Sequence, residues 1–366
     1  MRVAIRELVR RPGRFSVVGG ALVVLVLLLL FLGGLLDGLY LNSTGAVRAL
    51  DADAVVFSDD ARRSFLRSEI SPDLAETVAS VEGVERVGGL GFALLGVRIP
   101  GEEDVADGAV VGYELGSSEL PEPPAPGETY ADRQLAEDGA AVGDELLVGP
   151  AQVSLTIVGF VDDTNYLQQA GLWVEPGTWR RVLAENRPDA LVADGAFQSL
   201  VVRIDGADAA EVRDRIDEAT GGTDTLSDDG AIGAIPGISE QNATFTAVIG
   251  VTVVVAGLVV ALFFALLTLE RLGLYAVLKA FGGSSRTLVL GVIVQAVVVA
   301  VTAFVMGGAL TVGLLQVVPG EIPLQLEPSR AVSTLVSVTI AAVVGGLVSL
   351  RRIVRIDPAS AIGTGV

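Results

Sequence analysis

The chain has 366 residues, 51% of them hydrophobic, and a formal net charge of −19. This composition indicates membrane spans and excludes a nucleic-acid partner, which would need a basic face. The chain has no Cys and no His, and its single lysine, Lys279, is followed by Ala280 instead of the Ser or Thr of a phosphate-binding loop. We therefore expect no catalytic residue, no metal site and no cofactor in this chain.

Residues 1–40 are predicted to form an interfacial helix that leads into the first membrane span. The first fourteen residues contain five arginines, and Ile5, Leu8 and Val9 share one face of a helix there. The apolar run 15–36 has the roughly 20 residues that cross a hydrocarbon core about 30 Å thick. Because this run is about twice the usual length of a signal-peptide core, we expect it to be retained as a helix.

Residues 41–243 are long enough for a globular domain with its own core. Strand patterns at 54–57 and 84–99 flank a helix that starts near Ser71-Pro72, and the order strand, helix, strand returns at 200–226. Between them, the turn at Gly143-Asp144 and the alternation in 153–160 indicate short strands. The sequence thus predicts an α+β extracytoplasmic domain of two subdomains, with Trp173, Trp179 and Phe197 as core or interface residues.

Three further spans are predicted at 244–269, 288–318 and 332–350, separated by a cytoplasmic loop at 270–287 and an external loop at 319–331. A tail at 351–366 ends the chain. The apolar runs 15–36, 245–269, 288–318 and 332–350 contain no Asp, Glu, Lys or Arg. The fold class is therefore an α-helical membrane protein with four transmembrane helices and one large extracytoplasmic domain.

Charge sets the predicted orientation. Residues 1–14, the loop 270–287 and the tail together carry eleven basic and three acidic residues, a net charge of +8. The remainder carries 14 basic and 41 acidic residues, a net charge of −27. Because cytoplasmic segments are enriched in Lys and Arg, both termini are expected in the cytoplasm and the large domain outside the cell membrane.

The 270–287 loop is predicted to hold a short amphipathic helix, since Leu274, Leu278 and Phe281 recur at helical spacing. Gly282-Gly283 ends this helix, and Ser284 or Ser285 can cap the next one. Such a helix either lies on the bilayer or docks in a groove of a partner protein. Periodicity alone does not separate these two interpretations.

The loop also resembles a known family, the FtsX-like permeases of ABC transporters, which include the MacB and LolC/LolE types. In that family the loop reads like E-R-x-x-E-I-x-x-L-K-A-L-G-A-S, and this chain matches it at Glu270, Arg271, Leu278, Lys279, Ala280, Phe281, Gly282 and Ser284. It departs from the family at Leu274-Tyr275. The tail from Arg355 to Ala361 resembles the closing R-x-D-P-x-x-A, and one span, a domain and three spans is the family's layout.

The resemblance implies that 41–243 is a MacB-like core domain and that this chain is a permease subunit without an ATPase site. It also implies an ABC ATPase on a separate chain, which would hold ATP and Mg²⁺, and a second permease copy, identical or homologous. The expected ATPase interface is the coupling helix, comprising Glu270, Arg271, Leu274, Leu278, Lys279, Phe281 and Gly282. ATP-driven motion would pass from this helix to the external domain, for export or extraction of a substrate.

Small residues in the spans suggest close helix packing at Gly34 and Gly38, which have GxxxG spacing, and at Gly307-Gly308. Contacts between two permease copies there are a hypothesis. Two alternative functions stay open at this point: an FtsX-like transmembrane regulator that activates an external enzyme, and a receptor that works without transport or an ATPase. The coupling-loop motif argues against the receptor.

Overall fold

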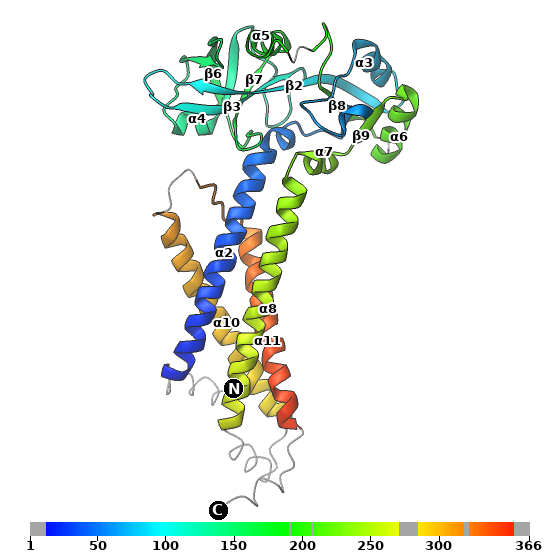
Figure 1. The fold of residues 1–366 in the computed structure, drawn as a ribbon. Coiled ribbons are helices and arrows are strands. Elements are labelled where there is room, and N and C mark those ends of the chain that lie inside the picture. Colours follow the sequence, from blue (N-terminus) through cyan, green and yellow to red (C-terminus); the bar gives the residue numbers. More distant parts are fainter. Residues whose placement is uncertain (1–11, 190–191, 207, 271–284, 318–321, 355–366) are drawn as a thin grey trace, which may run out of the picture. The chain divides into compact units, whose positions relative to one another are not determined.

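The computed structural model describes residues 12–189, 192–206, 208–270, 285–317 and 322–354. The chain forms two compact units, one made of Met1–Gly38 with Asn242–Val366 and the other of Leu39–Gln241. Long helices make up the first unit, and a nine-stranded sheet with short helices makes up the second (Figure 1). Two of the long helices continue across the boundary, so the units are joined by helical backbone.

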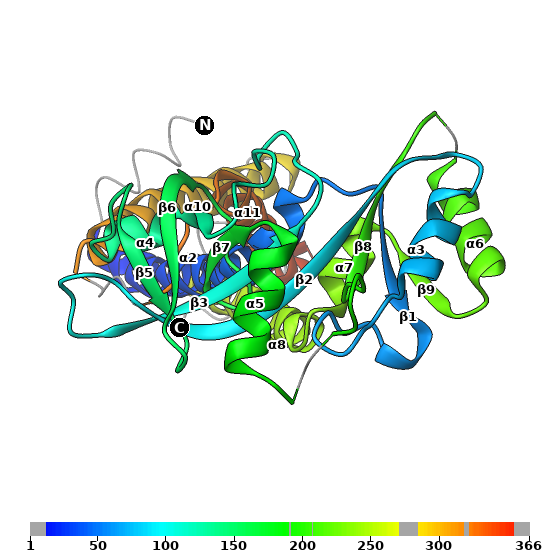
Figure 2. The ribbon, with the colours of Figure 1, turned by 90° about the horizontal axis from the view of Figure 1, so that it is seen from above.

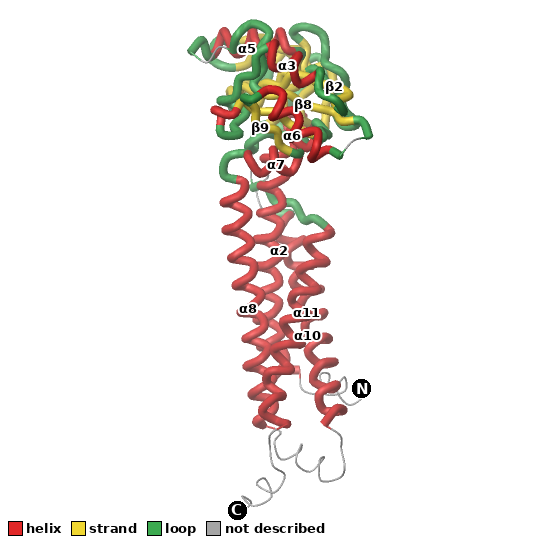
Figure 3. The backbone as a smooth tube through the Cα atoms, turned by 90° about the vertical axis from the view of Figure 1, so that its right-hand side faces the viewer, coloured by secondary structure: helices red, strands yellow, loops and turns green. Residues whose placement is uncertain are grey.

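The described part of the first unit contains four helices that lie alongside one another (Figure 3). They are α2 (Pro12–Ala49), α8 (Ile238–Glu270), α10 (Ser285–Leu315) and α11 (Pro328–Val354). Each contains a segment of 21 to 31 residues that is long and apolar enough to cross a membrane. The four predicted transmembrane helices are thereby confirmed.

Small and branched side chains pack the centre of this bundle. Val26 of α2, Ala256 of α8, Ala300 of α10 and Val338 of α11 are almost completely buried. The outward faces are equally apolar; Leu258 and Leu262 on α8, for example, are 63% and 64% exposed. Exposing such an apolar surface to water is unfavourable, whereas contact with lipid chains is not. The exterior is therefore that of a membrane-embedded bundle.

The helices extend beyond the apolar runs that the sequence marks. Helix α2 continues past residue 36 to Ala49, and α11 begins at Pro328 instead of 332. The membrane-crossing segments, Gly19–Ala49 and Pro328–Val348, therefore include Asp37 and Arg330. Asp37 and Arg330 lie just outside the apolar runs 15–36 and 332–350, which are themselves free of charged residues.

The second unit is organised around strand β2 (Val84–Arg98), the longest strand of the sheet. Its C-terminal half pairs with β3 (Val105–Tyr113), and its last two residues also pair with β5 (Glu145–Val148). Between these two partners lie β7 (Ala170–Val174), β4 (Glu128–Asp132) and β6 (Val153–Val161), in the order β3-β7-β4-β6-β5. Six strands therefore close into a ring through β2.

The N-terminal half of β2 belongs to an open part of the same sheet. There it pairs with β8 (Ser199–Ile204), which is followed by β1 (Ala54–Ser58) and β9 (Thr223–Leu226). Helices α3 (Pro72–Ala79) and α6 (Ala209–Thr220) pack against each other beside these strands (Figure 2). The two expected β-α-β pieces thus come together as one subdomain, and the middle of the sequence forms the other.

The remaining short elements are η1 (Asp59–Ala61), α4 (Arg133–Glu137), α5 (Pro176–Asn186) and α7 (Asp228–Ala234). Helix α5 lays the fully buried ring of Trp179 on the sheet, where Gly91 and Gly112 leave room that any side chain would fill. Phe197 stacks on this ring with 6.2 Å between centroids. Trp173 is also fully buried, so all three aromatic residues are core residues, as expected.

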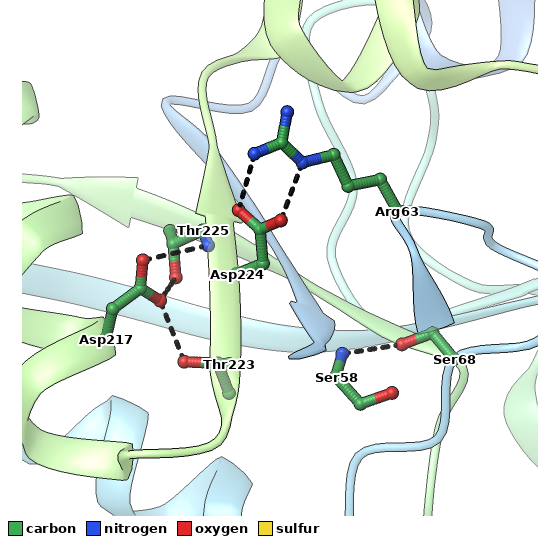
Figure 4. Close-up of polar contacts among 7 residues, drawn as sticks. All are labelled: Ser58, Arg63, Ser68, Asp217, Thr223, Asp224 and Thr225. Atoms are coloured by element: carbon green, nitrogen blue, oxygen red, sulfur yellow. Dashed lines mark hydrogen bonds and ion pairs between the residues drawn. The ribbon is translucent and has the colours of Figure 1, made fainter. Parts of the chain in front are cut away.

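Strand β9 is the outer strand of the open part, and polar side chains occupy its free edge (Figure 4). The Asp217 carboxylate on α6 accepts hydrogen bonds from the Thr225 amide at 3.1 Å and from the Thr223 hydroxyl at 2.8 Å. Arg63 forms an ion pair with Asp224 at 2.6 Å. An edge whose amide is already bonded is a poor template for pairing with another chain, so this cluster is protective.

Candidate functional site

The predicted ATPase interface falls almost entirely outside the described residues. Glu270 is the last residue of α8, whereas Arg271, Leu274, Leu278, Lys279, Phe281 and Gly282 lie outside the described residues. The coupling helix stays a prediction. The functional groups that the structure does describe lie along α2, first in the bundle and then in the external domain.

The four glycines predicted for helix packing lie at contacts within the chain itself. A side chain at Gly38 would overlap the carbonyl of Pro323, and one at Gly34 would come within 3.0 Å of Leu326. Gly307 on α10 faces Val26, and Gly308 lies near Leu30. Gly34 and Gly38 therefore seat the segment before α11 on α2, and dimer contacts at these positions stay a hypothesis.

Asp37 and Arg330 form an ion pair between α2 and α11. The Arg330 Nε lies 3.0 Å and 3.2 Å from the two carboxylate oxygens of Asp37, and Nη2 lies 2.5 Å from Oδ1. The Asp37 side chain is 11% exposed and that of Arg330 is 31% exposed. A charge at membrane depth needs such a partner, and an ionisable pair there is a functional candidate by default. Sequence reasoning missed it because the partners are 293 residues apart.

A small cavity of about 40 Å³ adjoins Arg330 of this pair. Leu29 of α2 and Ile249 and Val253 of α8 supply its apolar wall. The polar wall comes entirely from α11, with Arg330, Ser333, Thr334 and Ser337. Their spacing of three and four residues places these four side chains on one face of the helix.

Beyond the bundle, the β6–β7 loop (162–169) wraps around the last turns of α2. The amide of Ala46 donates to the carbonyl of Asn165 at 2.9 Å, and the amides of Leu167 and Gln168 donate to the carbonyls of Ser43 and Asn42 at 3.1 Å and 2.9 Å. We call this arrangement the α2 clasp: residues 162–169 around 42–46. It attaches the helix to the external domain by backbone contacts.

The clasp depends on close approach and on strained backbone. Gly45 lies so near the carbonyl of Asp163 that a Cβ there would overlap it, and the same Cβ would be 2.9 Å from the Asn165 nitrogen. Asp163, Leu167 and Gln168 have φ values of 53°, 51° and 65°, in the left-handed region that side chains disfavour. Such strain persists only where surrounding contacts fix the loop.

Buried Asp132 supplies that fixation. Its Oδ2 accepts hydrogen bonds from both the amide and the hydroxyl of Thr164, each at 2.7 Å, and its Oδ1 caps α4 through the Gln134 amide at 2.9 Å. Asp132 is 3% exposed. A carboxylate with three donors holds the loop as one rigid piece with strand β4. Tyr166 anchors the loop from the other side, in a cluster with Phe65 and Phe92.

A second carboxylate near the end of α2 has no donor in the described structure. Asp228, at the start of α7, has a buried Oδ1 that accepts no hydrogen bond from any described residue. Burial, with smaller contributions from the charges of Asp229 and Asp51, raises the pKa of Asp228 to about 6, while Arg48 opposes the shift. Within the described residues, no three potential metal ligands gather at one place.

Residues 246–358 match the sequence model of a protein family described as FtsX-like permease C-terminal. The predicted resemblance to FtsX-like permeases is confirmed over this part of the chain. The matched region begins in α8 and includes α10 and α11, and with them the polar wall of the cavity.

Curated relatives of this chain include two proteins of Mycobacterium tuberculosis strain H37Rv. The uncharacterized ABC transporter permease Rv2563 is 38% identical over 110 residues, which cover 30% of this chain and 31% of that protein. The uncharacterized ABC transporter permease Rv0072 is 37% identical over 114 residues, with the same coverage. The match thus spans about a third of the length of these relatives.

Solved structures similar to this chain are external domains. The periplasmic region of MacB from Actinobacillus actinomycetemcomitans has a TM-score of 0.34 and 12% identity, covering 50% of this chain and 92% of that one. The extracellular domain of YknZ, described as a noncanonic ABC-type transporter from Gram-positive bacteria, has a TM-score of 0.34 and 11% identity, covering 47% and 98%. These likenesses are too distant to bear on function.

Proposed function

We propose that this chain is the membrane permease subunit of an ABC transporter, in which ATP-driven motion from a separate ATPase subunit reaches the external domain and drives export or extraction of a substrate. The observation that carries the proposal is the match of residues 246–358 to FtsX-like permeases. The similarity to proteins named ABC transporter permeases supports it.

The energy source in this proposal is a partner chain, because the sequence lacks a phosphate-binding loop of its own. The partner would bind ATP and Mg²⁺ and dock on the 270–287 loop at the cytoplasmic side, where both termini are also expected from their basic residues. A second permease copy would complete the transporter. Movement of the bundle helices would then be transmitted to the external domain.

Helix α2 supports a mechanical path for that input. It is 38 residues long without interruption, about 57 Å at 1.5 Å per residue, and it ends inside the external domain. The α2 clasp grips its last turns through three backbone hydrogen bonds. In the proposed path, a displacement of α2 would act on this loop, and through it on strand β6, which the loop follows, and on strand β4, where Asp132 bonds the loop.

The test is capture of the ATPase. Affinity-tagged full chain is purified in mild detergent from its native membranes, and we expect an ABC ATPase in the eluate with ATP-hydrolysis activity. Glu270→Ala and Lys279→Ala should reduce its recovery several-fold, whereas Glu122→Ala in an exposed loop of the external domain should not. An eluate without any ATPase contradicts the proposal, and undiminished recovery with both variants contradicts the assigned interface.

A further inference from the structure

The cavity beside Asp37 and Arg330 has one apolar and one polar wall. Leu29, Ile249 and Val253 form the first wall, and α11 alone forms the second. The cavity volume of about 40 Å³ is a few times the roughly 10–15 Å³ that one water molecule needs, so the cavity takes one small polar group of a ligand and the rest of the ligand lies outside it. A space of mixed polarity fits an amphiphile better than a purely apolar chain.

Two hydroxyl groups on the polar wall make no hydrogen bond within the described part of the chain. Elsewhere in the membrane helices, Thr252 and Thr311 donate to the carbonyl four residues earlier, at 2.8 Å and 2.9 Å. This is the usual way for a helical threonine to satisfy its hydroxyl in an apolar environment. Thr334 is only 8% exposed, yet neither it nor Ser337 makes a side-chain hydrogen bond to any described residue, and both line the cavity. Their hydroxyls are available to a ligand.

Arg330 also has donors left over. Its bonds to Asp37 use Nε and Nη2, and Nη1 donates to no described residue. A guanidinium has five N–H groups in a planar fork, so Nη1 and the second hydrogen of Nη2 can hold another oxyanion while Asp37 stays bound. Arg330 would then bridge two anions, and the ion pair would orient this second fork toward the cavity.

We propose that this cavity binds the phosphate headgroup of one glycerophospholipid from the outer leaflet. Arg330 holds the phosphate through its second fork, and the Thr334 and Ser337 hydroxyls donate to oxygens of the glycerol region. An alkyl or acyl chain of the lipid continues along Ile249 and Val253. The site does not depend on the ATPase partner.

The depth of the polar wall agrees with this ligand. From Arg330 to Ser337 the helix rises about 10 Å, at 1.5 Å per residue, whereas one leaflet of the hydrocarbon core is about 15 Å thick. Arg330 lies two residues after the start of α11 and is paired with Asp37, next to Gly38, where the bundle part of α2 ends. The wall therefore spans the outer interface and the upper part of the outer leaflet, where phosphate and glycerol oxygens lie.

Photolabelling of the full chain in nanodiscs tests the site. The probe is a phosphatidylglycerol that carries a diazirine in one acyl chain, and labelled peptides are quantified by mass spectrometry. We expect label on the α8 peptide with Ile249 and Val253 at five or more times the level on α10 around Val305 and Leu310, which are exposed to bulk lipid. Excess unlabelled phosphatidylglycerol should abolish the difference, and excess diacylglycerol, which lacks the phosphate, should not.

Variants separate a built site from general lipid contact. Thr334→Val with Ser337→Ala removes both hydroxyls at nearly constant volume and should lower the α8 label to the α10 level. Thr311→Val is the matched control, because its hydroxyl is already bonded within its own helix, and it should label like the unaltered chain. Equal thermal unfolding of all three proteins excludes a folding defect as the cause.

Three results would overturn the proposal. Equal labelling of α8 and α10 would mean that the cavity holds water only. Undiminished labelling of the double variant would show that the hydroxyls take no part. If diacylglycerol competes as effectively as phosphatidylglycerol, the site does not recognise the phosphate. Each of these outcomes leaves ATPase capture unaffected, so the proposed transporter function is judged separately.

Discussion

Helix α2 is held in two ways along its length, and the two attachments differ in kind. In the bundle, a side-chain ion pair joins Asp37 to Arg330, and glycines let the neighbouring segment approach. In the external domain, the α2 clasp uses backbone amides and carbonyls around Gly45, and side chains contribute only by fixing the loop. The first attachment depends on charge and the second on the absence of a side chain.

This difference predicts different responses to substitution. A partly solvent-exposed ion pair can be replaced by another ion pair, or both partners can be removed together. Stability is lost mainly when one charge is left without its partner. A backbone contact that leaves no space for a Cβ atom tolerates no residue other than glycine, since any Cβ pushes the two segments apart. The clasp is therefore the more rigid attachment.

The largest effect is expected from Gly45→Ala. The new methyl group would overlap the Asp163 carbonyl and break the three hydrogen bonds of the clasp, so we expect a loss of roughly 3 kcal/mol in the stability of the external domain. Thermal unfolding followed by tryptophan fluorescence measures it, because the only two tryptophans, Trp173 and Trp179, are buried in this domain.

Gly233→Ala is the matched control for that measurement. Gly233 lies in α7 of the same unit with open space where a Cβ would be, and alanine favours a helix by up to about 1 kcal/mol. We expect no loss of stability. If Gly45→Ala unfolds at the same temperature as Gly233→Ala, the contact at Gly45 is looser than described and the clasp is not rigid.

The next effect is expected in the bundle. Asp37→Ala leaves Arg330 unpaired at membrane depth, and Arg330→Ala leaves Asp37 unpaired, so each should cost about 2 to 3 kcal/mol. The double variant should cost less than the sum, with a coupling energy of at least about 1 kcal/mol. Unfolding in SDS followed by far-UV circular dichroism measures all three. Additive losses would show that the pair contributes nothing of its own.

The sequence predicts a feature well when the residues that determine it are close together in the chain, and poorly when they are far apart. Four apolar runs are local signals, and they predicted the four membrane helices. The pairing of Asp37 with Arg330 has no local signal, because each charge only marks the end of a hydrophobic run. The helices extend beyond the apolar runs for the same reason: a hydropathy pattern stops at a charge, but backbone hydrogen bonding continues through it.

In the external domain several strands and two helices were predictable, whereas β3, β4, β7 and the closure of the ring were not. The alternation in β6 and the Ser-Pro start of α3 are visible in the sequence. The ring depends on β2 pairing with β3 at one edge and with β5 at its end, which is a matter of long-range register. Likewise, nothing in the sequence around Gly45 shows that the β6–β7 loop packs against it.

A smaller effect is expected from Asp132→Asn, which tests what fixes the clasp. The amide places an N–H₂ or a single oxygen where the carboxylate accepts three hydrogen bonds, so we expect a loss of about 1.5 kcal/mol and faster hydrogen exchange in residues 162–169. Asp107→Asn, at an exposed position of β3, is the control. Unchanged exchange would show that the loop is held by Tyr166 and its neighbours alone.

The smallest effect concerns pH and the unpaired carboxylate of Asp228. Its folded pKa of about 6 lies above the usual 3.8, so the folded domain favours the protonated form. The stability that this preference confers is complete below about pH 4 and is lost as the pH rises through 6. Because the side chain is only partly buried, solvent screening keeps the change small. Asp228→Asn should therefore flatten the stability profile between pH 4 and 6 and raise the unfolding temperature slightly at pH 7, while Asp60→Asn on the exposed surface should do neither. A profile for Asp228→Asn that still falls over this range would assign the titration to another group and leave the end of α2 without a pH-sensitive contact.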